Sequence, residues 1–384
     1  MKQTIEIRHL VPVLFGFFIM GFIDLVGISS NYIKQDFQLT DTMANFLLMM
    51  VFFWFAVLSV PTGVLMNRIG RKNTVLLSVI FTAIALSVPF FSYNLVTILI
   101  ALSLLGISNT ILQVSVNPLL ADIVPENRMA SSLTFGQFIK AIASFLGPVI
   151  TGFMAWYFGN WRLVFPALAL ISVGSALWLY FTPIAEEKVI ESKTTIKSCL
   201  SLLKDPFILS LFLGIVLVVG IDVGLNTSIP KYLMDKAHIP LEQAGLGISL
   251  YFISKTIGTF LGSILLMRFP VSKFYRYTSI LAVAAIIATL FASGTTTILT
   301  GVFITGLAVA NVFSIIFSIA LIRKPDLKNE ISGLMMMGII GGAIIPLFMG
   351  IVSDRFGQQA ALLVLLACLC YLLVNSLLIK IKES

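Results

Sequence analysis

The sequence predicts an all-α polytopic membrane protein with twelve transmembrane helices, arranged as two pseudo-symmetric six-helix bundles. Three observations predict this class. Of the 384 residues, 58% are hydrophobic and only 11% are charged, whereas soluble domains carry about 25% charged residues. The apolar residues form runs long enough to cross about 30 Å of hydrocarbon as helices. The charged residues gather between these runs, where water is accessible.

The apolar runs give the position of each predicted helix. Alternating segments of about ten residues, which are typical of a transmembrane barrel, are absent from the sequence. We expect helices over residues 9–31, 43–66, 74–92, 95–120, 130–157, 160–182, 207–232, 242–267, 275–293, 296–321, 330–351 and 357–380.

The basic residues predict the orientation in the membrane. With both termini in the cytoplasm, 18 of the 25 Lys and Arg residues fall in cytoplasmic segments and five in outer segments. We therefore expect a multi-pass protein of the cell membrane, specifically a bacterial inner membrane, surrounded by lipid and with both termini cytoplasmic. The net charge of +8 follows from this topology and gives no reason to expect nucleic-acid binding.

The most polar connection divides the chain into two halves. We expect an N-terminal six-helix bundle over residues 1–182, a cytoplasmic linker loop over 183–206 and a C-terminal six-helix bundle over 207–384. The first helix reads GFIDLVGISSNYI and the seventh reads GIDVGLNTSIPKYL, so the halves resemble each other. Such duplication predicts a transporter with its substrate site near the membrane midplane, between the halves.

Residues 63–72 carry a recognisable loop between the second and third helices. They read GVLMNRIGRK and resemble the signature G-x-L-x-D-R-x-G-R-K of the major facilitator superfamily, with Asn67 in place of the acid. The resemblance implies the major facilitator fold, a functional monomer and gating by Asn67, Arg68, Arg71 and Lys72. Because Asn67 has no charge, we expect the latch to depend on its hydrogen bonds and on Arg71 paired with carboxylates or a helix end.

Four ionisable residues, Asp24, Lys140, Asp222 and Lys255, lie deep inside predicted helices. Each costs roughly 2.5–3.5 kcal/mol at bilayer depth, so these residues need partners or a water-filled cavity. One alternative is structural, with Asp24 paired to Lys140 and Asp222 to Lys255, although desolvation offsets most of the gain from such pairs. The other alternative is transport, in which Asp24 and Asp222 carry the proton and Lys140 contacts the substrate.

A polar stripe on the fourth helix narrows the resemblance to one branch of the superfamily. Asn109, Gln113 and Asn117 follow at i, i+4 and i+8 on one helix face. With LTFGQ at 133–137 and GGAIIP at 341–346, this stripe resembles the fucose and glucose proton-symporter branch. The resemblance implies sugar symport with Asp24 as the carboxylate of the first helix.

Two positions depart from that branch. Gln113 stands where the branch has a second carboxylate, and Lys140 follows Gln137 where the branch has a neutral side chain. Losing an acid and gaining a base favours an anionic substrate such as a uronic or sialic acid, or another small organic anion.

Amide and aromatic side chains suit the hydroxyl rim and apolar face of a sugar. For Trp54, packing against helices or lipid stays an equal alternative. Besides the polar stripe and Lys140, the expected substrate contacts are Gln137, Asn226, Tyr251, Lys255, Asn311 and Trp54.

These observations predict a secondary active transporter that couples protons to symport of a sugar, an acidic sugar or a small organic anion by alternating access. One alternative is a proton-coupled drug or metabolite exporter, because GPVITG at 147–152 resembles a glycine-proline pattern of such antiporters. The other alternative is a membrane sensor that does not transport a substrate. No P-loop, nucleophile elbow or metal-ligand spacing appears, so we expect no enzyme activity, catalytic residue, metal or cofactor.

Overall fold

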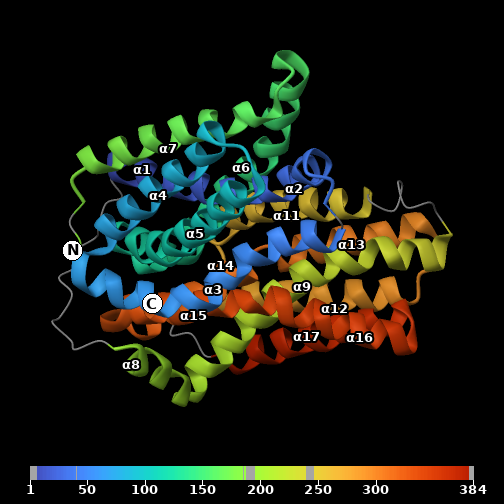
Figure 1. The fold of residues 1–384 in the computed structure, drawn as a ribbon. Coiled ribbons are helices and arrows are strands. Elements are labelled where there is room, and N and C mark those ends of the chain that lie inside the picture. The colour runs from blue at the N-terminus through green and yellow to red at the C-terminus, as the bar shows by residue number, and fades with distance from the viewer. Residues whose placement is uncertain (1–6, 40, 185, 187–194, 239–245, 380–384) are drawn as a thin grey trace. The chain divides into compact units, whose positions relative to one another are not determined.

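The computed structural model describes residues 7–39, 41–184, 186, 195–238 and 246–379 (Figure 1). These residues form helices and connections without any strand, which confirms the all-α prediction. The first half contains α1 (Ile7–Met20), η1 (Gly21–Asp24), α2 (Leu25–Asp36), α3 (Asp41–Ile69), α4 (Arg71–Phe91), α5 (Leu95–Ile123), η2 (Glu126–Arg128), α6 (Met129–Phe158), η3 (Trp161–Leu163) and α7 (Val164–Phe181), where η marks a short 3-10 helix. The second half contains α8 (Ile196–Ser201), η4 (Leu202–Lys204), α9 (Pro206–Ala237), α11 (Leu246–Leu265), α12 (Val271–Leu290), α13 (Thr295–Val309), α14 (Val312–Arg323), η5 (Pro325–Leu327), α15 (Lys328–Met337), η6 (Gly338–Ile340), α16 (Gly341–Phe356) and α17 (Gln358–Leu378).

The helices have the lengths and composition of membrane spans. Within the described residues, ten stretches are long and apolar enough to cross a bilayer, and two shorter apolar helices cover Phe53–Ile69 and Ser249–Leu265. This pattern is consistent with the twelve predicted segments. Large apolar side chains such as Phe91, Trp156 and Phe291 are almost fully exposed, as expected for groups that face lipid.

The chain folds into two compact units. Unit 1 comprises residues 1–126, 136–201 and 324–337, and unit 2 comprises residues 127–135, 202–323 and 338–384. The units largely follow the two sequence halves, with two exchanges. Helix α15 belongs to unit 1 because it packs on α3 and α5, and the first residues of α6 belong to unit 2.

Helix α5 occupies the centre of unit 1, where it packs against α1, α3, α4 and α15. Helix α15 also lies along α3 (Figure 1). Two glycines make that approach possible. A Cβ atom on Gly63 would lie 2.8 Å from the backbone oxygen of Asn329, and one on Gly333 would lie 2.7 Å from that of Ser59. Any larger side chain at these positions therefore separates α3 from α15.

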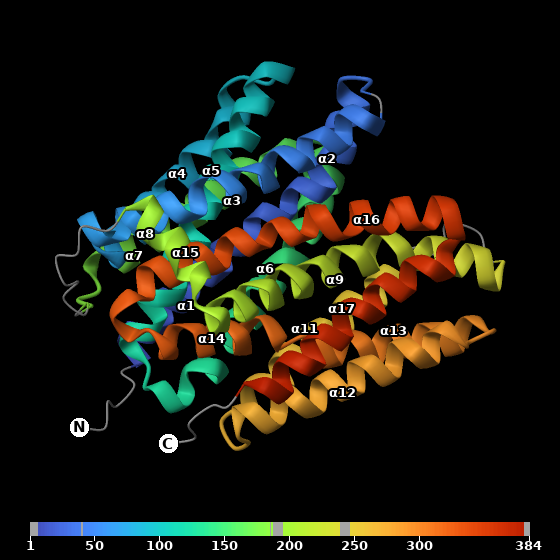
Figure 2. The same ribbon diagram turned by 90° about the horizontal axis from the view of Figure 1, so that it is seen from below.

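Helix α9 organises unit 2 in the same way, with α16 and α17 packed along it (Figure 2). A Cβ atom on Gly220 would lie 2.6 Å from Cβ of Ile345, and one on Gly224 would lie 2.6 Å from Sδ of Met349. Small residues at such contacts let membrane helices approach closely.

Three of the predicted spans are interrupted rather than continuous. The first is broken by η1, the tenth at residues 310–311 between α13 and α14, and the eleventh by η6. The break in the eleventh span directly precedes the GGAIIP stretch at 341–346. A short 3-10 segment inside a helix often marks a functional hinge, so each break is a place where a charged or polar group can leave the regular helix.

Candidate functional site

Asp24 lies where the first span breaks. It ends η1, its side chain is exposed, and it accepts a hydrogen bond from the Ser144 hydroxyl of α6. Gly21 permits this contact, because a Cβ atom there would lie 2.6 Å from the backbone oxygen of Lys140. The break therefore places a carboxylate against α6 inside a predicted membrane span.

Lys140 shares the face of α6 that carries Ser144, one turn earlier, and Gln137 lies half-buried a further turn back. Within the described residues, no ion pair shorter than 4.0 Å joins Lys140 to Asp24. The structural pairing of these two residues, one of the two alternatives from the sequence, is therefore not formed here. The backbone oxygen of Lys140, and not its ammonium group, is the part of this residue that contacts Ser144.

The polar stripe of α5 is buried in unit 1. Asn117 donates through Nδ2 to the backbone oxygen of Gln113 at 2.6 Å, so its amide is used within the helix. Asn109 differs, because its buried Nδ2 has no hydrogen-bond partner in the described part of the chain. Trp54 packs on the same helix: a Cβ atom on Gly106 would lie 2.8 Å from the indole Cδ1. Gly106 precedes Asn109 by three residues, so the indole packs on α5 about one turn before the unsatisfied amide.

In unit 2, Asp222 of α9 binds two side chains of α11. Tyr251 donates its hydroxyl to Oδ1, and Lys255 forms an ion pair with Oδ2. The predicted pairing of Asp222 with Lys255 is thus present. Tyr251 is buried, whereas the charged side chains of Lys255 and Asp222 keep 29% and 21% of their surfaces exposed. The ion pair is therefore only partly buried.

Asn226 and Asn311 occupy different environments. Asn226 lies one turn after Asp222, and its buried Oδ1 has no donor among the described residues. Asn311 lies at the break between α13 and α14, is 2% exposed and donates to the backbone oxygen of Gly258 at 3.1 Å. Its amide also packs directly on Gly262. The structure therefore places Asn311 in a helix contact, while Asn226 sits beside the ion pair.

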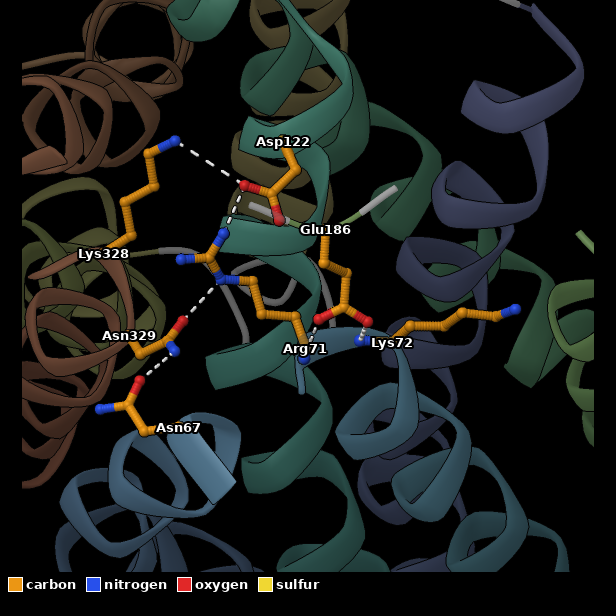
Figure 3. Close-up of polar contacts among 7 residues, drawn as sticks. All are labelled: Asn67, Arg71, Lys72, Asp122, Glu186, Lys328 and Asn329. Carbon is orange, nitrogen blue, oxygen red and sulfur yellow. Dashed lines mark hydrogen bonds and ion pairs between the residues drawn. The ribbon is translucent and has the colours of Figure 1, made fainter. Parts of the chain in front are cut away.

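A second polar cluster lies at one end of unit 1 and surrounds Arg71 (Figure 3). Arg71 is 4% exposed. Its Nη1 binds Asp122 of α5, and its Nε donates to Oδ1 of Asn329 at 2.6 Å. Lys328 adds a longer ion pair to the same Asp122 oxygen at 3.7 Å. We name the set Asn67, Arg71, Asp122, Glu186, Lys328, Asn329 and Glu330 the Arg71 cluster.

Asn67 completes the Arg71 cluster on α3. It donates through Nδ2 to Oε1 of Glu330 at 2.7 Å and accepts a hydrogen bond from the amide of Asn329. An amide can do both, because it carries a donor and an acceptor. Asn67 is therefore matched to its two neighbours on α15, and a neutral amide fits this position of the signature loop.

Glu186 and Lys72 bind the ends of two different helices, one an N-terminus and the other a C-terminus. The Glu186 carboxylate accepts from the backbone N–H groups of Arg71 at 2.6 Å and Lys72 at 3.0 Å, at the N-terminus of α4. Lys72 donates to the backbone oxygens of Tyr180 and Thr182 at the C-terminus of α7. Each charge has the sign that its helix end favours.

Of the four predicted gating residues, the structure brings Asn67 and Arg71 into one cluster and puts Lys72 next to it. Arg68 is exposed, and no described contact joins it to the cluster. The partners of Asn67 and Arg71 in the cluster were not predicted from the sequence; they are Asp122, Glu186, Lys328, Asn329 and Glu330. The charged string KNE at 328–330 was the available signal, but only the fold shows that it meets residues 67 and 71.

The fold and its buried ionisable groups define a polytopic helical membrane protein of the kind that moves polar solutes. A family model described as Major Facilitator Superfamily matches residues 12–320 and 211–384, and the chain belongs to this superfamily.

The individual relatives have low sequence identity to this chain. A glucose/galactose transporter of Brucella abortus biovar 1 (strain 9-941) is 26% identical over 372 residues, covering 93% of this chain and 90% of the relative. A crystal structure of the E. coli fucose:proton symporter superimposes with a TM-score of 0.84 at 18% identity, covering 96% of this chain and 98% of the other. The proton:xylose symporter has a TM-score of 0.74 at 14% identity, with 96% and 94% covered. The two structures share the fold with this chain.

Proposed function

We propose that the protein is a secondary active transporter that couples proton movement to symport of a monosaccharide by alternating access. The observation that carries the proposal is the Asp24 carboxylate at the η1 break, held by Ser144 one turn from Lys140. A carboxylate in a membrane span can hold or release a proton while substrate groups occupy its surroundings. The similarity to a glucose/galactose transporter supports a sugar as the substrate.

The roles follow from the contacts. Asp24 carries the proton, and Ser144 orients its carboxylate. Asn109 and the Trp54 indole offer an amide and an apolar ring face to the sugar, and a sugar hydroxyl would accept from the unsatisfied Nδ2 of Asn109. Gln113, Gln137 and Asn117 stay proposed contacts of the same polar region. Asn311 becomes a weaker candidate because its amide is already packed against α11.

We extend the proposal to acidic sugars and other small organic anions. Lys140 and Lys255 lie in segments that span the membrane, and an ammonium group is a natural partner for a carboxylate. Hexoses and acidic sugars therefore belong in the same set of trial substrates.

We also propose that the Arg71 cluster closes the cytoplasmic side in the transport cycle. The positive-inside distribution of Lys and Arg supports a cytoplasmic position for this end of α3, α4 and α15 and for both termini. The proposed location is a bacterial inner membrane. The two bundles of six helices work as a monomer in this proposal. Breaking and remaking the contacts of α15 with α3 and α4 gives the two states that alternating access needs.

The test is uptake of labelled glucose and galactose into proteoliposomes under an inward proton gradient. Accumulation above the equilibrium level that stops when the gradient is collapsed supports the proposal. Accumulation driven by an outward gradient would instead favour the exporter alternative. Transport that ignores the gradient would remove the proton from the mechanism.

A further inference from the structure

We propose that Asp222, Asn226, Tyr251 and Lys255 form a carboxylate-binding, proton-accepting site in unit 2 that makes the protein a transporter of acidic sugars. The inference rests on the proposed sugar transport and assigns the recognition of acidic sugars to one site. All four side chains belong to two packed helices, α9 and α11.

The four residues form one surface. Asp222 and Asn226 are one turn apart on α9, and Tyr251 and Lys255 are one turn apart on α11. The hydroxyl of Tyr251 and the ammonium of Lys255 bind different oxygens of Asp222. The pair is partly exposed, so a ligand can approach Lys255 without unfolding either helix.

Asn226 supplies an independent sign of a ligand. Its buried Oδ1 lacks a donor among the described residues, and a buried acceptor without a partner costs about 1–3 kcal/mol. A sugar hydroxyl next to Asp222 would donate to this oxygen. The site therefore offers an acceptor for a hydroxyl on α9 and a cation for a carboxylate on α11.

The charges of the site explain why binding of a substrate carboxylate is coupled to uptake of a proton. Asp222 and Lys255 together carry no net charge, so a substrate carboxylate that binds Lys255 leaves one uncompensated negative charge in the membrane. A proton taken from the aqueous side by Oδ2 of Asp222 removes that charge. The Lys255 hydrogen bond then passes from Asp222 to the substrate, Tyr251 continues to donate to Oδ1, and the proton leaves with the substrate on release.

Lys140 lacks this arrangement, because no ion pair joins it to Asp24 within the described residues. Few other charges face Asp222. Apart from Lys255, the charged residues of the helices packed on α9 lie at helix ends: Lys204 in η4, Arg323 at the end of α14, and Asp354 and Arg355 in the last turn of α16. Helices α13 and α17 carry no charged residue. Tyr251 and Lys255 are therefore the titratable groups in contact with the Asp222 carboxylate.

The experiment measures binding of glucuronate and glucose to the purified full-length protein in detergent. The quantity compared is the ratio of the Kd for glucuronate to the Kd for glucose. In wild type we expect saturable glucuronate binding, with about one proton taken up per glucuronate in weakly buffered solution. Glucose binding is expected to take up no proton at this site.

The decisive variant is the double substitution Asp222→Asn with Lys255→Gln, which keeps the net charge and replaces the ion pair with amides. We expect the Kd ratio to rise at least about tenfold and the proton uptake to disappear. The charge swap, Asp222→Lys with Lys255→Asp, keeps an ion pair but moves the cation to α9. If the swap folds and restores the wild-type ratio, the pair is only structural and the proposal fails.

Two control variants complete the design. Lys140→Asn is expected to weaken the binding of both sugars by a similar factor. A selective loss of glucuronate binding in that variant would instead assign recognition of the carboxylate to Lys140. Lys197→Gln, exposed on α8, is expected to keep the wild-type ratio. Glucose transport without any glucuronate binding would overturn this inference alone. Glucuronate binding that needs Lys255, in a protein that accumulates no sugar, would overturn the proposed transport alone.

Discussion

Nε of Arg71 on α4 donates to Oδ1 of Asn329 on α15 at 2.6 Å, across 258 residues of sequence. This bond joins a signature loop of the first half to the eleventh span. Asp122 binds the same guanidinium, so the positive charge is buried with a carboxylate and an amide around it. A buried arginine with two such partners fixes α15 against α3 and α4 in this state.

Replacing Asn329 by alanine should open the Arg71 cluster. The variant loses the bond to Arg71 and the bond to Asn67, and removal of one hydrogen bond to a charged group costs about 1.5–3 kcal/mol. Cys199 on α8 reports the change, because α8 packs on α3 and α15 and the thiol is fully buried. We expect the rate of N-ethylmaleimide labelling at Cys199, followed by peptide mass spectrometry, to increase about tenfold. An unchanged rate would mean that the cluster does not hold α15 in place.

The rate of labelling at Cys199 should also depend on pH. Burial, and then the negative charge of Glu330, raise the pKa of Cys199 to about 11. The thiolate is the reactive form, so about one thiol in a thousand is ionised at pH 8. Because the pKa is raised, labelling of wild type should increase about tenfold per pH unit between pH 7 and pH 10. In the Asn329→Ala variant the thiol is less buried, its pKa is lower, and the steep rise should level off at lower pH.

Asn67→Asp restores the acid of the family signature and should lower the thermal stability of this protein. The new carboxylate would face Oε1 of Glu330, which now accepts from the Asn67 amide at 2.7 Å. The expected loss in thermal stability corresponds to about 1–3 kcal/mol, because a buried hydrogen bond is replaced by repulsion between like charges. Adding Glu330→Gln gives that position a donor and should restore stability. If the single variant were as stable as wild type, the matching of Asn67 to Glu330 would be wrong.

The close approach of α3 and α15 can be tested with one methyl group. In Gly333→Ala the Cβ atom would lie 2.7 Å from the backbone oxygen of Ser59, so the helices must move apart. We expect a lower melting temperature and faster labelling of Cys199. Gly174→Ala is the matched control, because nothing lies within 4 Å of its Cβ position. Equal effects of the two substitutions would show that helix propensity, and not the contact, determines the outcome.

Much of the fold follows from local patterns in the sequence. Apolar runs locate the spans because a bilayer requires about twenty apolar residues per helix. The pairing of Asp222 with Lys255 was also among the sequence-based alternatives, since charges inside spans have few possible partners. The bond from Ser144 to Asp24 was not predicted, because it depends on the η1 break and on the close approach that Gly21 allows.

The Arg71 cluster was harder to predict for a similar reason. The signature loop indicated where a latch should be, but its partners come from α5, the segment after α7, and α15. No periodicity or spacing relates residues that lie 115 or 258 positions apart. The exchange of α15 into unit 1 is likewise a result of packing and not of chain order.

In the proposed mechanism, Asp24 carries the proton that drives sugar accumulation. The most direct measurement compares wild type with Asp24→Asn in proteoliposomes, first under an inward proton gradient and then in sugar exchange without a gradient. We expect the variant to lose gradient-driven accumulation and to retain measurable exchange, because the amide still accepts the hydroxyl of Ser144 but cannot take up a proton. Ser144→Ala, with the carboxylate intact, should keep gradient-driven accumulation at a reduced rate. Accumulation at the wild-type level in Asp24→Asn would show that Asp24 does not carry the coupled proton.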